Sequence, residues 1–77
     1  MRLNDAIRSE LKKLCLDNGI TEYELAKKSG VKRNTLNNFM NLELRYISLN
    51  KLCRLIRVFD LSLSKFFSDS IFKDVSL

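Results

Sequence analysis

The sequence predicts a small all-α domain built from five short helices. Apolar side chains recur at the three- and four-residue spacings of a helix throughout the 77-residue chain. No stretch of six or more residues before the C-terminal tail alternates cleanly between apolar and polar side chains, as a half-buried strand would. A chain of this length has room for one domain, so we expect a single domain over residues 1–77, with a core of about 4–68 and a C-terminal tail of 69–77.

The first helix is expected from about Asp5 to Asp17. Its apolar residues form one stripe: Ile7, Leu11, Leu14 and Cys15. Gly19 follows the helix and can end it, because glycine adopts positive φ at little cost.

The next two helices are short and lie on either side of Gly30. Thr21 and Glu24 have the spacing of a capping box, in which each side chain accepts a hydrogen bond from the other residue's backbone N–H. We therefore expect Thr21 to open the second helix and Gly30 to end it. The third helix is predicted roughly from Arg33 to Met40.

Two serines mark the last two helices. After a loop over residues 41–47, Ser48 is expected to cap the fourth helix, which Asp60 and Leu61 interrupt. Its apolar residues are Leu49, Leu52, Cys53, Ile56 and Phe59. Ser62 is expected to cap a shorter fifth helix, and residues 71–77 are compatible with an extension of that helix, a strand or a frayed end.

The charge of the chain is concentrated in its middle. Lys and Arg number 14 against 9 Asp and Glu, which gives a net charge of +5. Residues 27–57 alone carry +7, whereas residues 1–26 and 58–77 each carry −1. Such a block is typical of a nucleic-acid-binding face, but it is equally compatible with a solvated surface that keeps a protein soluble.

Composition argues against an enzyme, a cofactor or a metal site. The chain has no His, which removes the usual general base of serine and cysteine hydrolases, and with two Cys it has too few zinc ligands. Two Gly cannot build a glycine-rich phosphate loop. Cys15 and Cys53 are interpreted as reduced core residues in preference to a disulfide. No signal peptide or membrane span is evident, so we expect a cytoplasmic protein.

Residues 22–41 have the spacing of a helix-turn-helix. Ala26 supplies the small side chain needed where two crossing helices approach closely, and Gly30 supplies the positive φ of the turn. Apolar residues that anchor the second helix are Val31, Leu36 and Phe39. The alternative is a plain αα-hairpin with no function.

The exposed face of the helix from Arg33 to Met40 favours DNA. Arg can bond guanine through two atoms and Asn can bond adenine in the same way. A solvated helix without a function would more often carry Glu and Lys than three Asn, which form helices poorly. The candidate base-contacting residues are Lys32, Arg33, Asn34, Asn37 and Asn38, with Thr35 at the edge as a phosphate contact.

Three blocks in order carry a resemblance to a known family. They are GITEYELAKKSGVKRNTL at 19–36, ISLNKLC at 47–53 and DLSLSKFF at 60–67. The chain resembles the phage-repressor-like (Xre/Cro, lambda-repressor-like) helix-turn-helix family over about residues 4–68. The resemblance implies a five-helix domain, with the helix-turn-helix at helices two and three, that binds a palindromic operator in double-stranded DNA as a homodimer.

The resemblance also assigns individual positions. Arg33, Asn34 and Asn38 fall where family members contact bases, whereas Thr35, Asn41 and Arg45 match phosphate-contact positions. Tyr46, beside Arg45, and Lys51, nearest the loop, are further phosphate candidates, although Lys51, Arg54 and Arg57 together have the spacing of a solvated helix face.

Two departures from the family pattern stand out. Glu22 takes the place of a Gln that touches DNA in many members, and it would repel a phosphate. Cys15 and Met40 take the places of an Arg and a Glu that pair in many members, and we interpret them as a repacked apolar core.

The last part of the chain is rich in apolar residues, which suggests a dimer interface. Its candidates are Leu63, Phe66, Phe67, Ile71 and Phe72. The sequence thus predicts a dimeric transcriptional repressor of the prophage-repressor, restriction-modification-controller or antitoxin type. The alternative is a protein-interaction module that keeps the fold and binds a protein partner, such as a toxin or an antirepressor.

Overall fold

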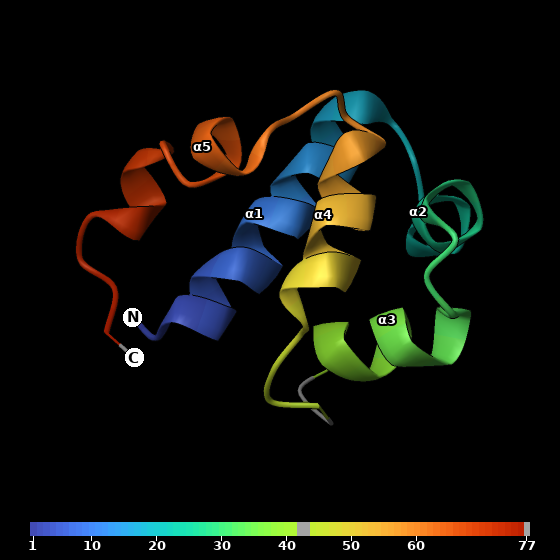
Figure 1. Ribbon diagram of the computed structural model, residues 1–77, viewed down its shortest axis with the longest axis horizontal. Helices are drawn as coiled ribbons and strands as arrows, with labels where there is room; N and C mark the ends of the chain where they lie inside the picture. Colours follow the sequence, from blue (N-terminus) through green and yellow to red (C-terminus); the bar gives the residue numbers. More distant parts are fainter. Residues whose placement is uncertain (42–43, 77) are drawn as a thin grey trace.

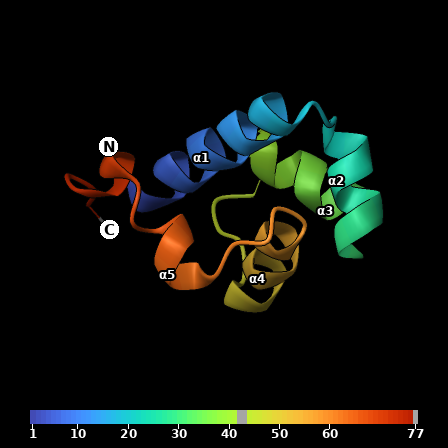
Figure 2. The same ribbon diagram turned by 90° about the horizontal axis from the view of Figure 1, so that it is seen from above.

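The computed structural model describes residues 1–41 and 44–76, and this part of the chain is helical, as predicted (Figure 1). The elements in chain order are α1 (Leu3–Asn18), α2 (Glu22–Ser29), α3 (Arg33–Met40), α4 (Leu49–Arg57), α5 (Leu63–Phe66) and the short 3-10 helix η1 (Ser70–Phe72). In both views α2 and α3 lie together at one end of the molecule, while α5 and the two chain termini lie at the other (Figures 1 and 2).

The helix ends follow the local signals in the sequence. The capping box is present: Glu24 N–H donates to Thr21 Oγ1 at 3.1 Å, and Thr21 N–H donates to Glu24 Oε1 at 3.1 Å. Gly19 and Gly30 end α1 and α2 with φ of 64° and 77°, a region that glycine enters without strain. Ser48 and Ser62 cap α4 and α5, each accepting a backbone N–H three residues later at 3.2 Å.

The end of α4 differs from the prediction. The helix stops at Arg57, so Phe59, which we expected within it, lies two residues beyond. The chain reverses over residues 58–60, where Asp60 adopts φ of 57°. An Asp tolerates this left-handed conformation better than most residues do. The turn closes when Leu61 N–H donates to Ile56 O at 3.2 Å.

One hydrophobic core joins the helices. Its buried members come from every α-helix: Ile7, Leu11, Cys15, Leu25, Ala26, Val31, Leu36, Phe39, Met40, Leu52, Leu55, Ile56 and Phe66. Cys15 and Met40 are both in this cluster, so both are apolar core residues, as expected. Cys15 and Cys53 are free thiols, as expected, with Cys53 half-buried. Burial, and then the nearby Glu22 carboxylate, raise the pKa of the Cys15 thiol.

The tail folds back on the start of the chain. Asp69 caps η1 by accepting the Ile71 N–H at 3.1 Å. Further along, Ser76 pairs with the first residues: Leu3 N–H donates to Ser76 O at 2.9 Å, and Ser76 N–H donates to Met1 O at 3.0 Å. The tail therefore neither extends α5 nor frays over its described length. It closes the chain beside α1 through an isolated bridge between Arg2 and Ser76.

The predicted dimer residues are partly used inside the chain. Phe66 is only 1% exposed, so it is a core residue and not part of a surface patch. Phe66, Phe67 and Phe72 form one aromatic cluster, with ring centroids 4.8–5.5 Å apart. Leu63, Phe67, Ile71 and Phe72 are half-buried, and a role for them in a dimer stays a prediction.

We expect Thr21→Ala to lower the free energy of unfolding by about 1 kcal/mol, because it leaves an N–H at the start of α2 without its acceptor. Urea unfolding of the DNA-free protein measures this change. Thr21→Ser keeps the hydroxyl, so its free energy of unfolding is expected to fall much less. Equal losses for the two variants would show that the hydroxyl does not cap the helix.

A second prediction concerns Glu10, which is buried on α1 beside Asp69. Burial, and then the negative charge of Asp69, raise the pKa of Glu10 above its ordinary value of 4.5. The folded protein therefore holds a proton there more tightly than the unfolded chain, and stability falls as the pH rises through the range above 4.5. Glu10→Gln removes this loss, so we expect a higher urea midpoint than wild type at pH 7.

The advantage of Glu10→Gln should shrink as the pH falls towards 4.5, because wild-type Glu10 then becomes protonated too. Asp74→Asn removes an exposed acid from the tail and serves as the control, with little expected change. An advantage that is the same at pH 7 and at acid pH would contradict the assignment to Glu10 ionisation.

Candidate nucleic-acid interface

The two helices of the predicted motif meet through their apolar sides. Leu25 and Ala26 from α2 and Leu36 and Phe39 from α3 are buried, and so is Val31 in the turn between them. The small Ala26 side chain stands within the core where α2 and α3 pack. This packing leaves the opposite side of α3 facing outward.

The structure places most of the predicted base-contacting residues on that outward side. Lys32, Arg33, Asn34 and Asn37 are exposed, whereas Asn38 and Thr35 are half-buried. The Asn38 carbonyl accepts the Leu44 N–H at 3.0 Å, so this residue also fastens the following loop to α3. A face made of one Lys, one Arg and Asn side chains presents hydrogen-bond donors and positive charge together.

Two side-chain contacts orient members of this face. The Arg33 guanidinium lies over the Tyr23 ring of α2, 4.9 Å from its centroid. The Asn41 Nδ2 donates to Asn37 Oδ1 at 2.8 Å, so the Asn37 Nδ2 takes no part in this hydrogen bond and can donate elsewhere. Tyr23 of α2 therefore positions the side chain of a candidate base-contacting residue.

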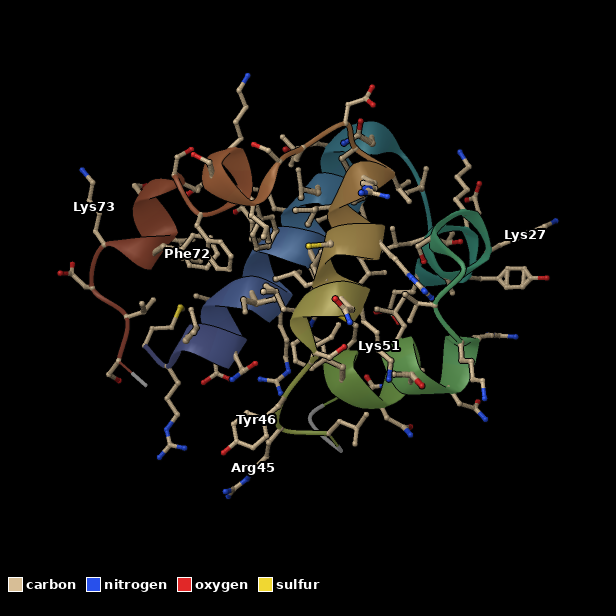
Figure 3. The ribbon with its side chains drawn as sticks, in the orientation of Figure 1. Lys27, Arg45, Tyr46, Lys51, Phe72 and Lys73 are labelled. Carbon is tan, nitrogen blue, oxygen red and sulfur yellow. The ribbon has the colours of Figure 1, made fainter. Side chains whose placement is uncertain are left out.

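The loop after α3 carries Arg45 and Tyr46 on the outside of the molecule. Both side chains are exposed, and they point away from the body of the protein beside α3 (Figure 3). Lys51 is exposed in the first turn of α4, directly after this loop. The loop and the start of α4 thus continue the positively charged surface beyond α3.

The anchor of this loop is Arg8, which sequence reasoning missed. Its guanidinium is buried between α1 and the loop, where it donates to the Phe39, Leu44 and Arg45 carbonyls at 2.6, 2.9 and 3.2 Å. Asp5 pairs with it at 2.8 Å. A signal was present in the sequence, because Arg8 falls in phase with Leu11 and Cys15 on the buried side of α1.

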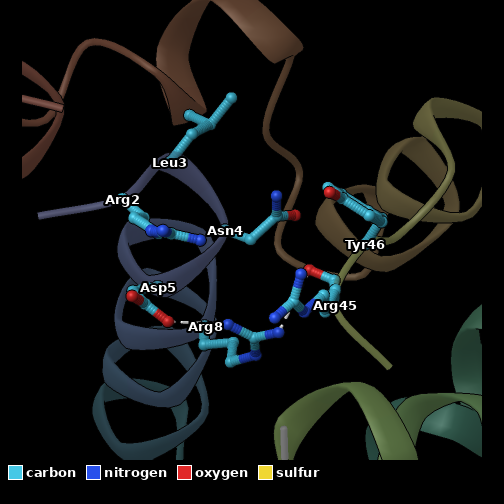
Figure 4. Close-up of a pocket in the computed structure, with 7 residues that line it drawn as sticks. All are labelled: Arg2, Leu3, Asn4, Asp5, Arg8, Arg45 and Tyr46. Carbon is cyan, nitrogen blue, oxygen red and sulfur yellow. Dashed lines mark hydrogen bonds and ion pairs between the residues drawn. The ribbon is translucent and has the colours of Figure 1, made fainter. Parts of the chain in front are cut away.

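A cavity of about 440 Å³ lies beside this anchor. It is bounded by residues 2–5 at the start of α1, by Arg8, and by Arg45 and Tyr46 from the loop (Figure 4). Three Arg and one Asp line it, and Asp5 is occupied by Arg8, so the cavity is net positive.

Charged residues also line two other hollows. Arg54 and Arg57 on α4 and Lys28 on α2 line a hollow of about 320 Å³ that contains no acidic residue. That Arg54 and Arg57 form a solvated face together with Lys51 stays a prediction. Glu22 is half-buried in the first turn of α2, where Tyr23 and Arg33 share a small hollow with it.

Within residues 1–41 and 44–76, no group of three or more His, Cys, Asp or Glu side chains is arranged to hold a metal ion. No helix in the described part of the chain is long and apolar enough to cross a membrane.

Comparison with known families agrees with this geometry. The family model for the Cro/C1-type helix-turn-helix DNA-binding domain matches residues 10–69, which extend from the middle of α1 to the cap of η1. The chain belongs to the Cro/C1-type helix-turn-helix family. The helix-turn-helix of this domain corresponds to α2 and α3. The all-α fold predicted from the sequence is confirmed. Neither the curated proteins nor the solved structures compared with this chain include a significant match.

We expect Tyr23→Ala to release the Arg33 side chain, because it removes the ring that holds the guanidinium. Contacts of this kind at exposed sites contribute about 0.5–1 kcal/mol. Proton NMR measures the change directly, since the ring shifts the resonances of Arg33 side-chain protons. Tyr23→Phe keeps the ring and should preserve the shifts; their persistence in Tyr23→Ala would show that Tyr23 does not hold Arg33.

Proposed function

We propose that this protein is a sequence-specific transcriptional regulator that binds double-stranded DNA as a dimer and represses from a palindromic operator. The observation that supports it best is the division of α3 into two sides. Leu36, Phe39 and Met40 are buried on one side, whereas Lys32–Asn34 and Asn37 are exposed on the other. Such a helix can enter a major groove with its polar side while its apolar side stays in the core.

Within this proposal the polar residues divide into two classes. Arg33, Asn34, Asn37 and Asn38 contact base edges, because their side chains offer the paired hydrogen bonds that distinguish guanine and adenine. Lys32, at the start of α3, joins them. Thr35, Asn41, Arg45, Tyr46 and Lys51 contact phosphates, which fixes the position of α3 without reading the sequence.

A dimer is proposed because the family resemblance implies a palindromic operator. Two copies of α3 would then enter major grooves about 34 Å apart. The half-buried residues Leu63, Phe67, Ile71 and Phe72 are the proposed contact between copies. They lie in and after α5, at the end of the molecule away from α2 and α3 (Figures 1 and 2). Prophage repressor, restriction-modification controller and antitoxin are the three biological settings that suit this proposal.

The test is a DNA-binding measurement on an operator selected from random DNA. Each phosphate neutralised by Lys or Arg makes log K fall with log salt by a slope of about 0.9, so wild-type affinity should drop steeply as salt rises. Arg33→Ala is expected to cost about 1–3 kcal/mol on the operator and to relax preference at one base position. Sedimentation of the same samples measures the dimer.

Lys73→Ala is the matched control, because it removes one positive charge at the opposite end of the molecule from α3 (Figure 3). It should leave operator affinity almost unchanged. Equal weakening by Arg33→Ala on all DNA sequences would place Arg33 among the phosphate contacts. Failure of the wild-type protein to bind any DNA would contradict the proposal and favour the protein-interaction module.

A further inference from the structure

We infer that Arg8 is a positioning residue, which holds the loop of Arg45 and Tyr46 in a fixed place relative to α3 so that the two engage DNA as one rigid unit. This inference rests on the proposed function. It concerns a side chain that cannot itself reach DNA, because the Arg8 side chain is only 9% exposed and its charge is paired with Asp5 at 2.8 Å.

Arg8 connects two segments that lie on either side of residues 41–43. Its Nε donates to the Phe39 carbonyl at 2.6 Å, in the last turn of α3. Its Nη2 donates to the Leu44 carbonyl at 2.9 Å and to the Arg45 carbonyl at 3.2 Å, in the loop. One planar group thereby fastens the end of the base-facing helix and the start of the phosphate-facing loop to the same point on α1.

Among the cationic side chains, only arginine can make all of these contacts from this position on α1. The last carbonyls of a helix lack partners within the helix, and a cation near them is favourable. The guanidinium offers five N–H donors in a fixed plane, so it can serve three carbonyls and a carboxylate together. It also lies 4.4 Å from the centroid of the Phe39 ring, which is itself fully buried. A lysine has one nitrogen and cannot span these partners.

The tether acts on the loop backbone and leaves the loop side chains free. Arg8 binds the main-chain oxygen of Arg45, while the exposed residues Arg45 and Tyr46 line the cavity (Figure 4). The backbone at Leu44 and Arg45 is thus held in place before DNA arrives. Ordering a loop during binding costs affinity, and an interaction that orders it beforehand removes that cost.

The experiment is a double-mutant cycle measured by DNA affinity. Arg45→Ala is introduced into the wild type and into Arg8→Met, which keeps an apolar stem but has no donors. On its own, Arg45→Ala should weaken binding to all DNA sequences and lower the salt slope by about 1. In the Arg8→Met background it should have much less effect, because the loop no longer presents the side chain at the phosphate.

Arg33→Ala in the same two backgrounds is the internal control. Arg33 lies in the first turn of α3 and does not touch Arg8, so the two losses should combine to within about twofold, as independent sites do. For Arg8→Met combined with Arg45→Ala, the loss of affinity should differ from the product of the two single losses by clearly more than twofold. A merely structural role for Arg8 would weaken binding without this selective coupling.

Folding is checked for each variant by urea unfolding and by NMR, and binding is measured where each is folded. If Arg8→Met does not fold, Arg8→Lys, which retains the charge and a single donor nitrogen, replaces it in the cycle and should show a smaller coupling of the same sign. An Arg45→Ala loss of equal size in the wild-type and variant backgrounds would overturn the inference while leaving DNA binding intact. Loss of wild-type DNA binding, in contrast, would overturn the proposed function itself.

Discussion

The structure depends on the burial of one side of α3. Eight residues are too few for a helix to persist in water by itself, since isolated helices shorter than about 12–15 residues are marginal. Phe39 and Leu36 are 0% and 1% exposed, and they fix α3 to the core. Because packing supplies the stability, the outward side is free to carry Asn residues that would otherwise weaken the helix.

Local signals allowed most of the fold to be predicted. The Thr21 and Glu24 box, the glycines after α1 and α2, and Ser48 and Ser62 act on neighbouring backbone groups, so their effect is visible in the sequence. The helix boundaries therefore agree within a few residues. The exception is the end of α4, where a turn through Asp60 came earlier than the apolar pattern suggested.

Features that join distant parts of the chain were missed. Arg8 reaches residues 31 to 37 positions away, and no local pattern reveals which carbonyls will lie beside it. The pairing of Ser76 with the first residues is a contact of the same kind. Phe66 is among the candidate dimer residues because its neighbours are also apolar, and only the three-dimensional packing reveals that it is buried in the core. The exposed residues of α3 were predictable because they follow directly from the helical period.

The bridge between Arg2 and Ser76 brings the two ends of the chain side by side. The backbone leaves one end of α1, passes through the helix-turn-helix and returns to the start of α1. A pulling force applied between the two ends would first load the paired hydrogen bonds at the bridge and the contact of η1 with α1. The helix-turn-helix is not part of these closing contacts, but Arg8 links the end of α3 to α1. Strain between the termini would thus first open these closing contacts, and the link from Arg8 to Phe39 is the route by which it would then reach α3.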